Sequence, residues 1–322
     1  MEKPPVVDVH VHLFCISDRS GGYMSPRARH SLELGYTLLR YGYRGNSDSF
    51  DIKYVNYILK QVRASKWTDK VVLLALDGVY DADGQLDLDL TNAYVPNDYC
   101  RDVCAFHEEL LYGASVNPDR RGALDELERV KEDGAVLIKW LPNSQNFDPG
   151  DKKYIPFYKK LAELDLPLLS HTGYEHSIHV YDQLYGNPVR LVYALDEGVK
   201  VIAAHGGTAG VYDPLEFFDE YLEMFDRHPN LYGDTAAITG ITRFAYIPTM
   251  LEHPGFMERH LQATDYPAPP LPVLFTKQLG LKKALGIQFA RNIFDRDIEN
   301  KLALGFPESF LYNSAEVLGV DW

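Results

Sequence analysis

The chain has 322 residues, of which 46% are hydrophobic, and this is enough apolar material for one barrel-sized domain or two ordinary ones. Its formal net charge of -14 argues against nucleic acid or an anionic membrane as a partner. No apolar run is long enough for a transmembrane helix, and the N-terminal segment lacks the apolar core of a signal peptide. Together with only three cysteines, this predicts a cytoplasmic protein without a disulfide framework.

Short apolar, β-branched runs alternate with helical patterns along the chain. The runs begin at Val6, Val71, Leu110, Ala135, Pro167, Lys200, Asn230 and Leu261. Strands that alternate with helices predict a parallel sheet. Eight such units favour a distorted (β/α)8 TIM barrel that forms a single domain over residues 1–322. An open, doubly wound sheet is the alternative, but no Gly-x-Gly-x-x-Gly turn follows the first strand.

The connection after the first strand, residues 17–70, is much longer than a return helix requires. It contains two helical patterns, "RHSLELGYTLLRYGY" and "SFDIKYVNYILKQVRAS". Because this connection leaves the catalytic end of a barrel, we expect a helical insertion that acts as a lid over the mouth.

A cysteine pair, Cys100 and Cys104, lies in the helical pattern "YCRDVCAFHEELL" together with His107. Their spacing places both thiols on one helix face. We interpret them as packed helix residues; a structural zinc site is the alternative, but it would need a fourth ligand.

Polar residues stand at the ends of several predicted strands. The first strand carries His10 and His12, which share a face because they are two residues apart. The others are Lys139 on the fourth strand, His171 on the fifth, His205 on the sixth and Asp265 on the eighth. In a parallel barrel these ends converge on one mouth, where histidines and a carboxylate together suit a divalent metal ion.

At this point the chain resembles the amidohydrolase superfamily, and within it the amidohydrolase 2 branch related to aminocarboxymuconate semialdehyde decarboxylase. The motifs that carry the resemblance are "DVHVH", "IKWLP", "SHTG", "AHGG", "ATDYP" and "ESFLYNSAEVLGV". Two motifs depart from the family pattern. Ser314 separates the usual Asn-Ala pair, and Ala263-Thr264-Asp265 stands where Gly-Ser-Asp is common. Neither departure removes a ligand.

The resemblance implies that His10, His12, His171 and Asp265 hold one divalent ion, with zinc expected and manganese, iron or cobalt as alternatives. His205 would contact the metal-bound water or the substrate. A bound metal can lower the pKa of a water from 15.7 to about 7. Asp265 is the candidate to accept the proton of that water and pass it to a leaving group.

Lys139 leaves the number of metal ions open. Some amidohydrolases carboxylate a lysine on the fourth strand, which then bridges two metals, with His205 joining the second. We favour one metal and a cationic Lys139 that faces the substrate. Asp8 is expected to support the ligands or to cap a loop.

Residues that follow the strand ends are weaker candidates for substrate binding. Arg243 follows the seventh strand and could bind a substrate carboxylate bidentately. Trp140 and Tyr174, with Glu175 and His176, could line the pocket. For each of them, an ordinary loop residue is the favoured interpretation.

These patterns lead to three functional hypotheses. The first is a metal-dependent hydrolase of a small amide, lactone or ester. The second is a non-oxidative decarboxylase of an aromatic or muconate-like acid on the same site. The third is a non-catalytic metal-binding barrel. The expected partner is a small-molecule substrate, with neither nucleic acid nor a membrane, and a homodimer is left open.

Overall fold

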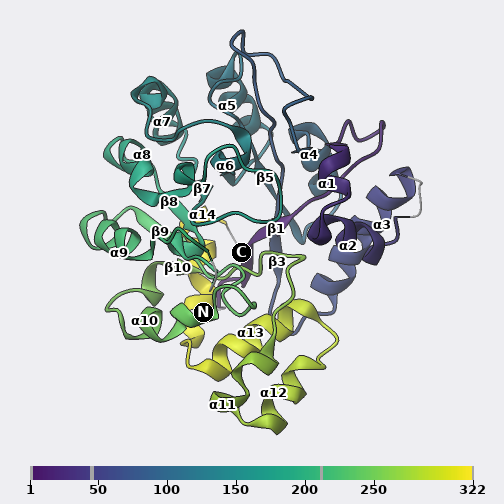
Figure 1. Cartoon of the computed structure of the whole chain (residues 1–322), viewed down its shortest axis with the longest axis vertical. Coiled ribbons are helices and arrows are strands. Elements are labelled where there is room, and N and C mark those ends of the chain that lie inside the picture. Colours follow the sequence, from purple (N-terminus) through teal and green to yellow (C-terminus); the bar gives the residue numbers. More distant parts are fainter. Residues whose placement is uncertain (1–2, 44–46, 211–212, 321–322) are drawn as a thin grey trace.

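The computed structural model describes residues 3–43, 47–210 and 213–320. Eight parallel strands form one sheet in the order β1, β3, β5, β6, β7, β8, β9 and β10 (Figure 1). Their bounds are β1 (Val7–His12), β3 (Lys70–Leu74), β5 (Leu110–Ala114), β6 (Leu137–Trp140), β7 (Leu168–His171), β8 (Val201–Ala204), β9 (Leu231–Asp234) and β10 (His260–Leu261).

The first strand closes the sheet against the segment that follows the last. The amide of Val9 donates to the carbonyl of Gln262, and the amide of His12 donates to that of Tyr266, both at 3.0 Å. A parallel bridge also joins Val11 to Tyr266. The predicted TIM barrel is therefore confirmed.

Helices return the chain between the strands on the outside of the barrel (Figure 1). The helices after β3 are α4 (Asn97–Ala105), α5 (Ala123–Glu132), α6 (Pro142–Gln145), α7 (Ile155–Glu163), α8 (Val192–Asp196), α9 (Phe218–Arg227), α10 (Ile247–Glu252), α11 (Thr276–Leu279), α12 (Leu281–Gln288), α13 (Ile293–Leu304) and α14 (Asn313–Leu318). In α9 the buried residues are Phe218, Tyr221, Met224 and Phe225. Their three- and four-residue spacing gives the apolar stripe that packs on the sheet.

Two apolar layers lie on either side of the sheet, as the two-residue period of a strand requires. Residues such as Val7, Val9 and Leu137 pack inside the barrel, whereas Ile138 and Trp140 belong to the layer between the strands and the helices. Lys139 lies on the same face of β6 as Leu137, two residues closer to the mouth of the barrel.

Between β1 and β3 the chain forms β2 (Tyr23–Met24), α1 (Pro26–Arg29), α2 (Leu32–Arg40) and α3 (Ser47–Arg63). Serine side chains cap α1 and α2, since Ser25 and Ser31 accept hydrogen bonds from first-turn amides. The helices α2 and α3 occupy the segments in which two helices are expected. That this segment acts as a lid stays a prediction.

The two cysteines of α4 pack in the core, as the first interpretation predicts. Cys100 and Cys104 are buried, and the Cys100 thiol contacts the Leu73 carbonyl at 3.3 Å. Among the described residues, these thiols and His107 form no group with metal-ligand spacing. As for membranes, each helix in the described ranges is too short or too polar to cross a bilayer.

Candidate active site

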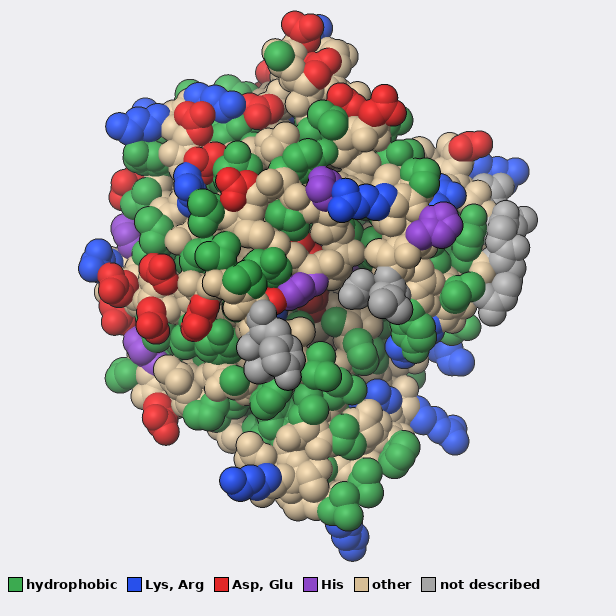
Figure 2. All heavy atoms as spheres, viewed as in Figure 1, with side chains coloured by type: hydrophobic (Ala, Val, Ile, Leu, Met, Phe, Trp, Pro, Cys, Tyr) green, Lys and Arg blue, Asp and Glu red, His purple; other side chains and the backbone are tan. Residues whose placement is uncertain are grey.

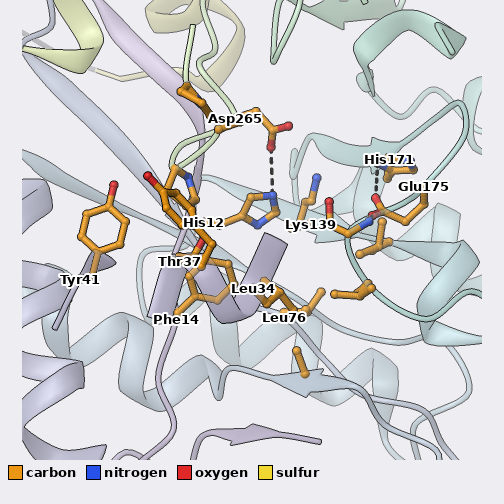
Figure 3. Close-up of a pocket in the computed structure, with 18 of the residues that line it drawn as sticks. His12, Phe14, Leu34, Thr37, Tyr41, Leu76, Lys139, His171, Glu175 and Asp265 are labelled. Carbon is orange, nitrogen blue, oxygen red and sulfur yellow. Dashed lines mark hydrogen bonds and ion pairs between the residues drawn. The ribbon is translucent and has the colours of Figure 1, made fainter. Parts of the chain in front are cut away.

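A cavity of about 340 Å³ opens at the C-terminal ends of the strands. Figure 2 shows this hollow near the centre of the face, with acidic and histidine side chains visible in it. Residues of α2, among them Leu34 and Arg40, form part of its wall. Polar side chains from four strand ends and one loop reach it, namely His12, Lys139, His171, His205 and Asp265. Figure 3 labels all of these except His205.

Three of the four predicted metal ligands come together at this mouth. One ligand atom each from His10, His12 and Asp265 lies within 4.8 Å of the others. The Asp265 Oδ1 atom lies 3.2 Å from Nε2 of His12 and 3.5 Å from Nε2 of His10. Burial raises the pKa of Asp265, but His10, His12 and His205 outweigh it and hold that pKa well below its usual range. The carboxylate is therefore ionised.

The fourth predicted ligand, His171, lies beside this group but outside it. Its ring centroid is 5.0 Å from that of His205, and its Nδ1 lies 3.6 Å from Oε2 of Glu175. Its Nε2 is buried and has no hydrogen-bond partner among the residues that the structure describes. An orphaned imidazole nitrogen next to two histidines and a carboxylate is what a divalent ion would satisfy, so the residues fit the metal that the sequence predicts. The ligand assignments themselves stay predictions.

His205 faces the cavity from a strained turn. Its φ is +64°, in the left-handed region that few side chains adopt. Its Nδ1 lies 3.1 Å from the carbonyl oxygen of Ala236, which can only accept a proton. Burial, and after it the Arg243 cation, lower the pKa of His205 to about 3. The ring is therefore neutral, with Nδ1 as donor and Nε2 as the free acceptor.

Asp234, at the end of β9, is a site residue that the sequence analysis missed. It is 1% exposed, and its Oδ2 lies 2.8 Å from Nδ1 of His10. Its Oδ1 accepts the amide of His205 at 2.9 Å. The signal was present in the sequence, because "NLYGD" ends a predicted strand in a carboxylate as the other strands end in histidines.

Lys139 is buried, and its Nζ lies 3.0 Å from Nε2 of His10. Burial lowers the pKa of Lys139 to about 8, against the opposing effect of Asp234 and Asp265. Figure 3 shows the ammonium pointing into the space between His12, His171 and Asp265. Lys139 thus lies where the strand period predicts, inside the mouth.

Asp8 fastens the first strand to the Asp265 segment. Its Oδ1 accepts the amide of His10 at 3.0 Å and that of Thr264 at 3.1 Å. Asp265 itself has a φ of +65°, so its backbone needs such support. Burial raises the pKa of Asp8 to about 7.

Four of the five weaker candidates for substrate binding do not line the cavity. Trp140 packs among Phe147 and Phe157 on the helix side of β6, and its indole nitrogen donates to Val116. Arg243 is buried and donates to Thr208 and to the Tyr174 carbonyl.

Tyr174 places its ring against His176, which is paired with Asp213. Of the five candidates, Glu175 alone lines the cavity, and the binding roles of the others stay predictions without a cavity contact.

The barrel, with polar side chains gathered at its mouth, defines the class of TIM-barrel proteins. A family model described as Amidohydrolase matches residues 7–285. The chain therefore belongs to this amidohydrolase family, as its motifs indicate. No curated protein sequence matches the chain.

Solved structures with the same fold are distant in sequence. The 5-carboxyvanillate decarboxylase LigW from Sphingomonas paucimobilis aligns with a TM-score of 0.59 and 14% identity, over 99% of this chain and 100% of that one. The 4-oxalomesaconate hydratase LigJ from Rhodopseudomonas palustris gives 0.57 and 17%, over 98% and 95%. A 5-carboxyvanillate decarboxylase from Novosphingobium aromaticivorans with bound manganese gives 0.54 and 12%, over 98% and 97%. These likenesses show the fold.

Proposed function

We propose that this protein is a metal-dependent hydrolase of a small lactone, ester or amide. The observation that carries the proposal is the ionised Asp265 carboxylate, which faces the cavity 3.2 Å from one predicted ligand, His12, and 3.5 Å from another, His10. A divalent ion held by His10, His12, His171 and Asp265 would supply Lewis-acid polarisation and a more acidic water. Zinc is the expected ion, with manganese as the first alternative.

Different residues of the chain then act on the protons of the attacking water. Asp265 accepts the proton of the attacking water at a carboxylate oxygen and returns it to the leaving group. His205, whose Nε2 is an acceptor, orients the second proton of that water. Lys139, a buried cation that lines the cavity, can donate to a substrate oxygen. Apolar side chains such as Leu34, from α2, exclude bulk water.

A second candidate is a non-oxidative decarboxylase, and the composition of the cavity favours it. The wall is largely apolar and includes Phe14, Leu76, Leu141 and Ile178, which suits an aromatic acid. Lys139 would hold the carboxylate or a ring hydroxyl. Two of the similar structures are decarboxylases by name.

A substrate panel separates the two. The metal-loaded protein is assayed with lactones and esters by proton release, with amides by release of the amine, and with hydroxylated aromatic acids by release of carbon dioxide. We expect hydrolysis without carbon dioxide. Carbon dioxide release without hydrolysis would support the decarboxylase instead. If no member of either set is turned over while the ion stays bound, the non-catalytic barrel becomes the better hypothesis.

A further inference from the structure

Three arginines line a second cleft, of about 180 Å³, between α2, α3 and α13. Arg40 ends α2, Arg291 precedes α13, and Arg296 lies in the first turn of α13. The remaining walls are Tyr41, Tyr57, Gln61, Tyr266 and Ile293. In Figure 2, blue side chains gather at the lower right, beside α12 and α13, where little red is visible.

The positive charge in this cleft has no acidic counterpart among the residues that the structure describes. The described residues that line it include no Asp or Glu, although the chain has 46 acidic residues against 32 Lys and Arg. In the described part of the chain, none of the three guanidinium groups forms an ion pair. Burial and the nearby Arg40 lower the pKa of Arg296. Like charges held together without an acid indicate that an anion completes the group.

One guanidinium nitrogen of Arg296, a residue that lines the cleft, has no hydrogen-bond partner among the described residues. The Nη2 atom of Arg296 donates to the carbonyl of Ala290 at 2.6 Å, but its Nε is buried and has no hydrogen-bond partner. Buried donors are nearly always satisfied, so an unpaired guanidinium nitrogen beside two further arginines points to a missing acceptor.

The backbone of α13 does not supply the recognition. Asn292 caps the helix by accepting the amides of Phe294 and Asp295, at 3.0 and 3.2 Å. The amide of Ile293 donates to the Gln61 side chain at 3.0 Å. With these amides occupied, the guanidinium groups are the available donors, and the Gln61 contact fixes the start of α13 against α3.

We infer that this cleft binds an oxyanion group, the phosphate or carboxylate of a small molecule. The planar arginine fork matches such oxygens in a bidentate manner. The rings of Tyr41 and Tyr57, 5.3 Å apart, offer an apolar wall for the attached organic part. Arg40 and Tyr41 line the catalytic cavity as well, so the anion site and the active site share a wall.

Isothermal titration of the full metal-loaded chain tests this inference. Inorganic phosphate and acetate are titrated separately, at an ionic strength held constant with sodium chloride. We expect a saturable site whose Kd depends on the cleft arginines, and the tighter anion identifies the source. Arg296→Gln should weaken binding about tenfold or more and Arg291→Gln about threefold or more, because each removes a charged donor.

Arg227→Gln is the matched control, since Arg227 is an exposed arginine on α9, paired with Glu223, far from the cleft in sequence. It should leave the Kd unchanged, as should Asp265→Asn in the catalytic cavity. The inference is overturned if neither anion binds saturably, or if Arg227→Gln weakens binding as much as Arg291→Gln does. Binding that is lost in Asp265→Asn but kept in Arg291→Gln would assign the anion to the cavity. Arg291 is exposed, so its variant keeps the test valid even if Arg296→Gln misfolds.

Discussion

Asp234 fixes the orientation of His10 from behind. Its Oδ2 lies 2.8 Å from Nδ1 of His10, and both side chains are at most 1% exposed. Burial raises the pKa of Asp234, but His10 and His205 outweigh it and lower that pKa below its usual value. An ionised carboxylate only accepts protons, so Nδ1 is the donor and Nε2 carries the lone pair that faces the mouth.

The first prediction is that Asp234→Asn weakens metal binding about 10- to 100-fold, because carboxylates behind metal-binding histidines have effects of this size. Competition with a chromogenic chelator measures the affinity. Asp213→Asn is the matched control, since Asp213 pairs with the half-exposed His176 outside the metal group. Equal affinities for Asp234→Asn and the unmodified protein would contradict the orienting role.

The site was predictable to the extent that strand ends converge. The positions of His12, Lys139, His171, His205 and Asp265 at one mouth follow from the topology alone. The topology does not predict which side chains contact each other within the mouth. The link between Asp234 and His10 joins residues 224 apart in sequence, and neither periodicity nor spacing pairs them.

The alternation of strands and helices in the sequence predicts the fold. The departures from a regular barrel have local causes. Successive side chains of a strand point to opposite faces, so Trp140, which follows Lys139, faces the helices. This position lies away from the pocket in which Trp140 was predicted. The last strand is only His260–Leu261. Beyond it, Gln262 and Tyr266 accept amides from β1 across a segment in which Asp265 turns left-handed, which a hydrophobic pattern does not reveal.

The second prediction concerns the ion itself. Elemental analysis of active protein should find about one divalent ion per chain, and its removal by a chelator should lower the melting temperature, because a ligand of the native state stabilises that state by mass action. Restoring zinc or manganese should recover both stability and activity. Active protein that contains no transition metal would reject the metal centre.

The third prediction is that Asp265→Asn lowers turnover by about two to four orders of magnitude, since general acid-base transfer contributes that much. The amide cannot accept a proton, although it can still coordinate weakly. Glu175→Gln is the comparison, because Glu175 also lines the cavity but contacts only His171 among the predicted ligands. Circular dichroism should show both variants folded. If Asp265→Asn stayed within a few-fold of the unmodified protein, the proton shuttle would lie elsewhere.

The fourth prediction tests a buried ion pair behind the mouth. Lys301 is fully buried, and its Nζ donates to Asp297 at 2.6 Å and to the Ala263 carbonyl at 2.8 Å. Lys301→Ala leaves the Asp297 charge unpaired, so the free energy of unfolding should fall by about 3–5 kcal/mol. Lys282→Ala, at an exposed position of α12, should change it by less than about 0.5 kcal/mol. Denaturant titrations measure both, and equal effects would contradict the ion-pair argument.

Lys139 decides the number of metal ions. Its Nζ lies 3.0 Å from Nε2 of His10, which is the nitrogen that a metal would need. One lone pair cannot serve both partners, so an incoming ion must displace the ammonium. In the one-metal case the displaced Lys139 turns to the substrate. In the two-metal case a carboxylated Lys139 supplies anionic oxygens that bridge ions about 3.5–4 Å apart.

The fifth prediction follows from the one-metal hypothesis. Lys139→Ala should keep about one ion per chain and bind it at least as tightly, because the competing ammonium is gone, while turnover falls with the lost donor to substrate oxygen. Lys139→Met is the matched variant, since it keeps most of the side-chain volume and should behave alike. Metal content and the competition assay measure the first effect and steady-state kinetics the second. In the bridged case the same change would instead empty a second site, and short carboxylic acids would restore it. A mass increase of one carboxyl group on Lys139, with two ions per chain, would overturn the one-metal reading.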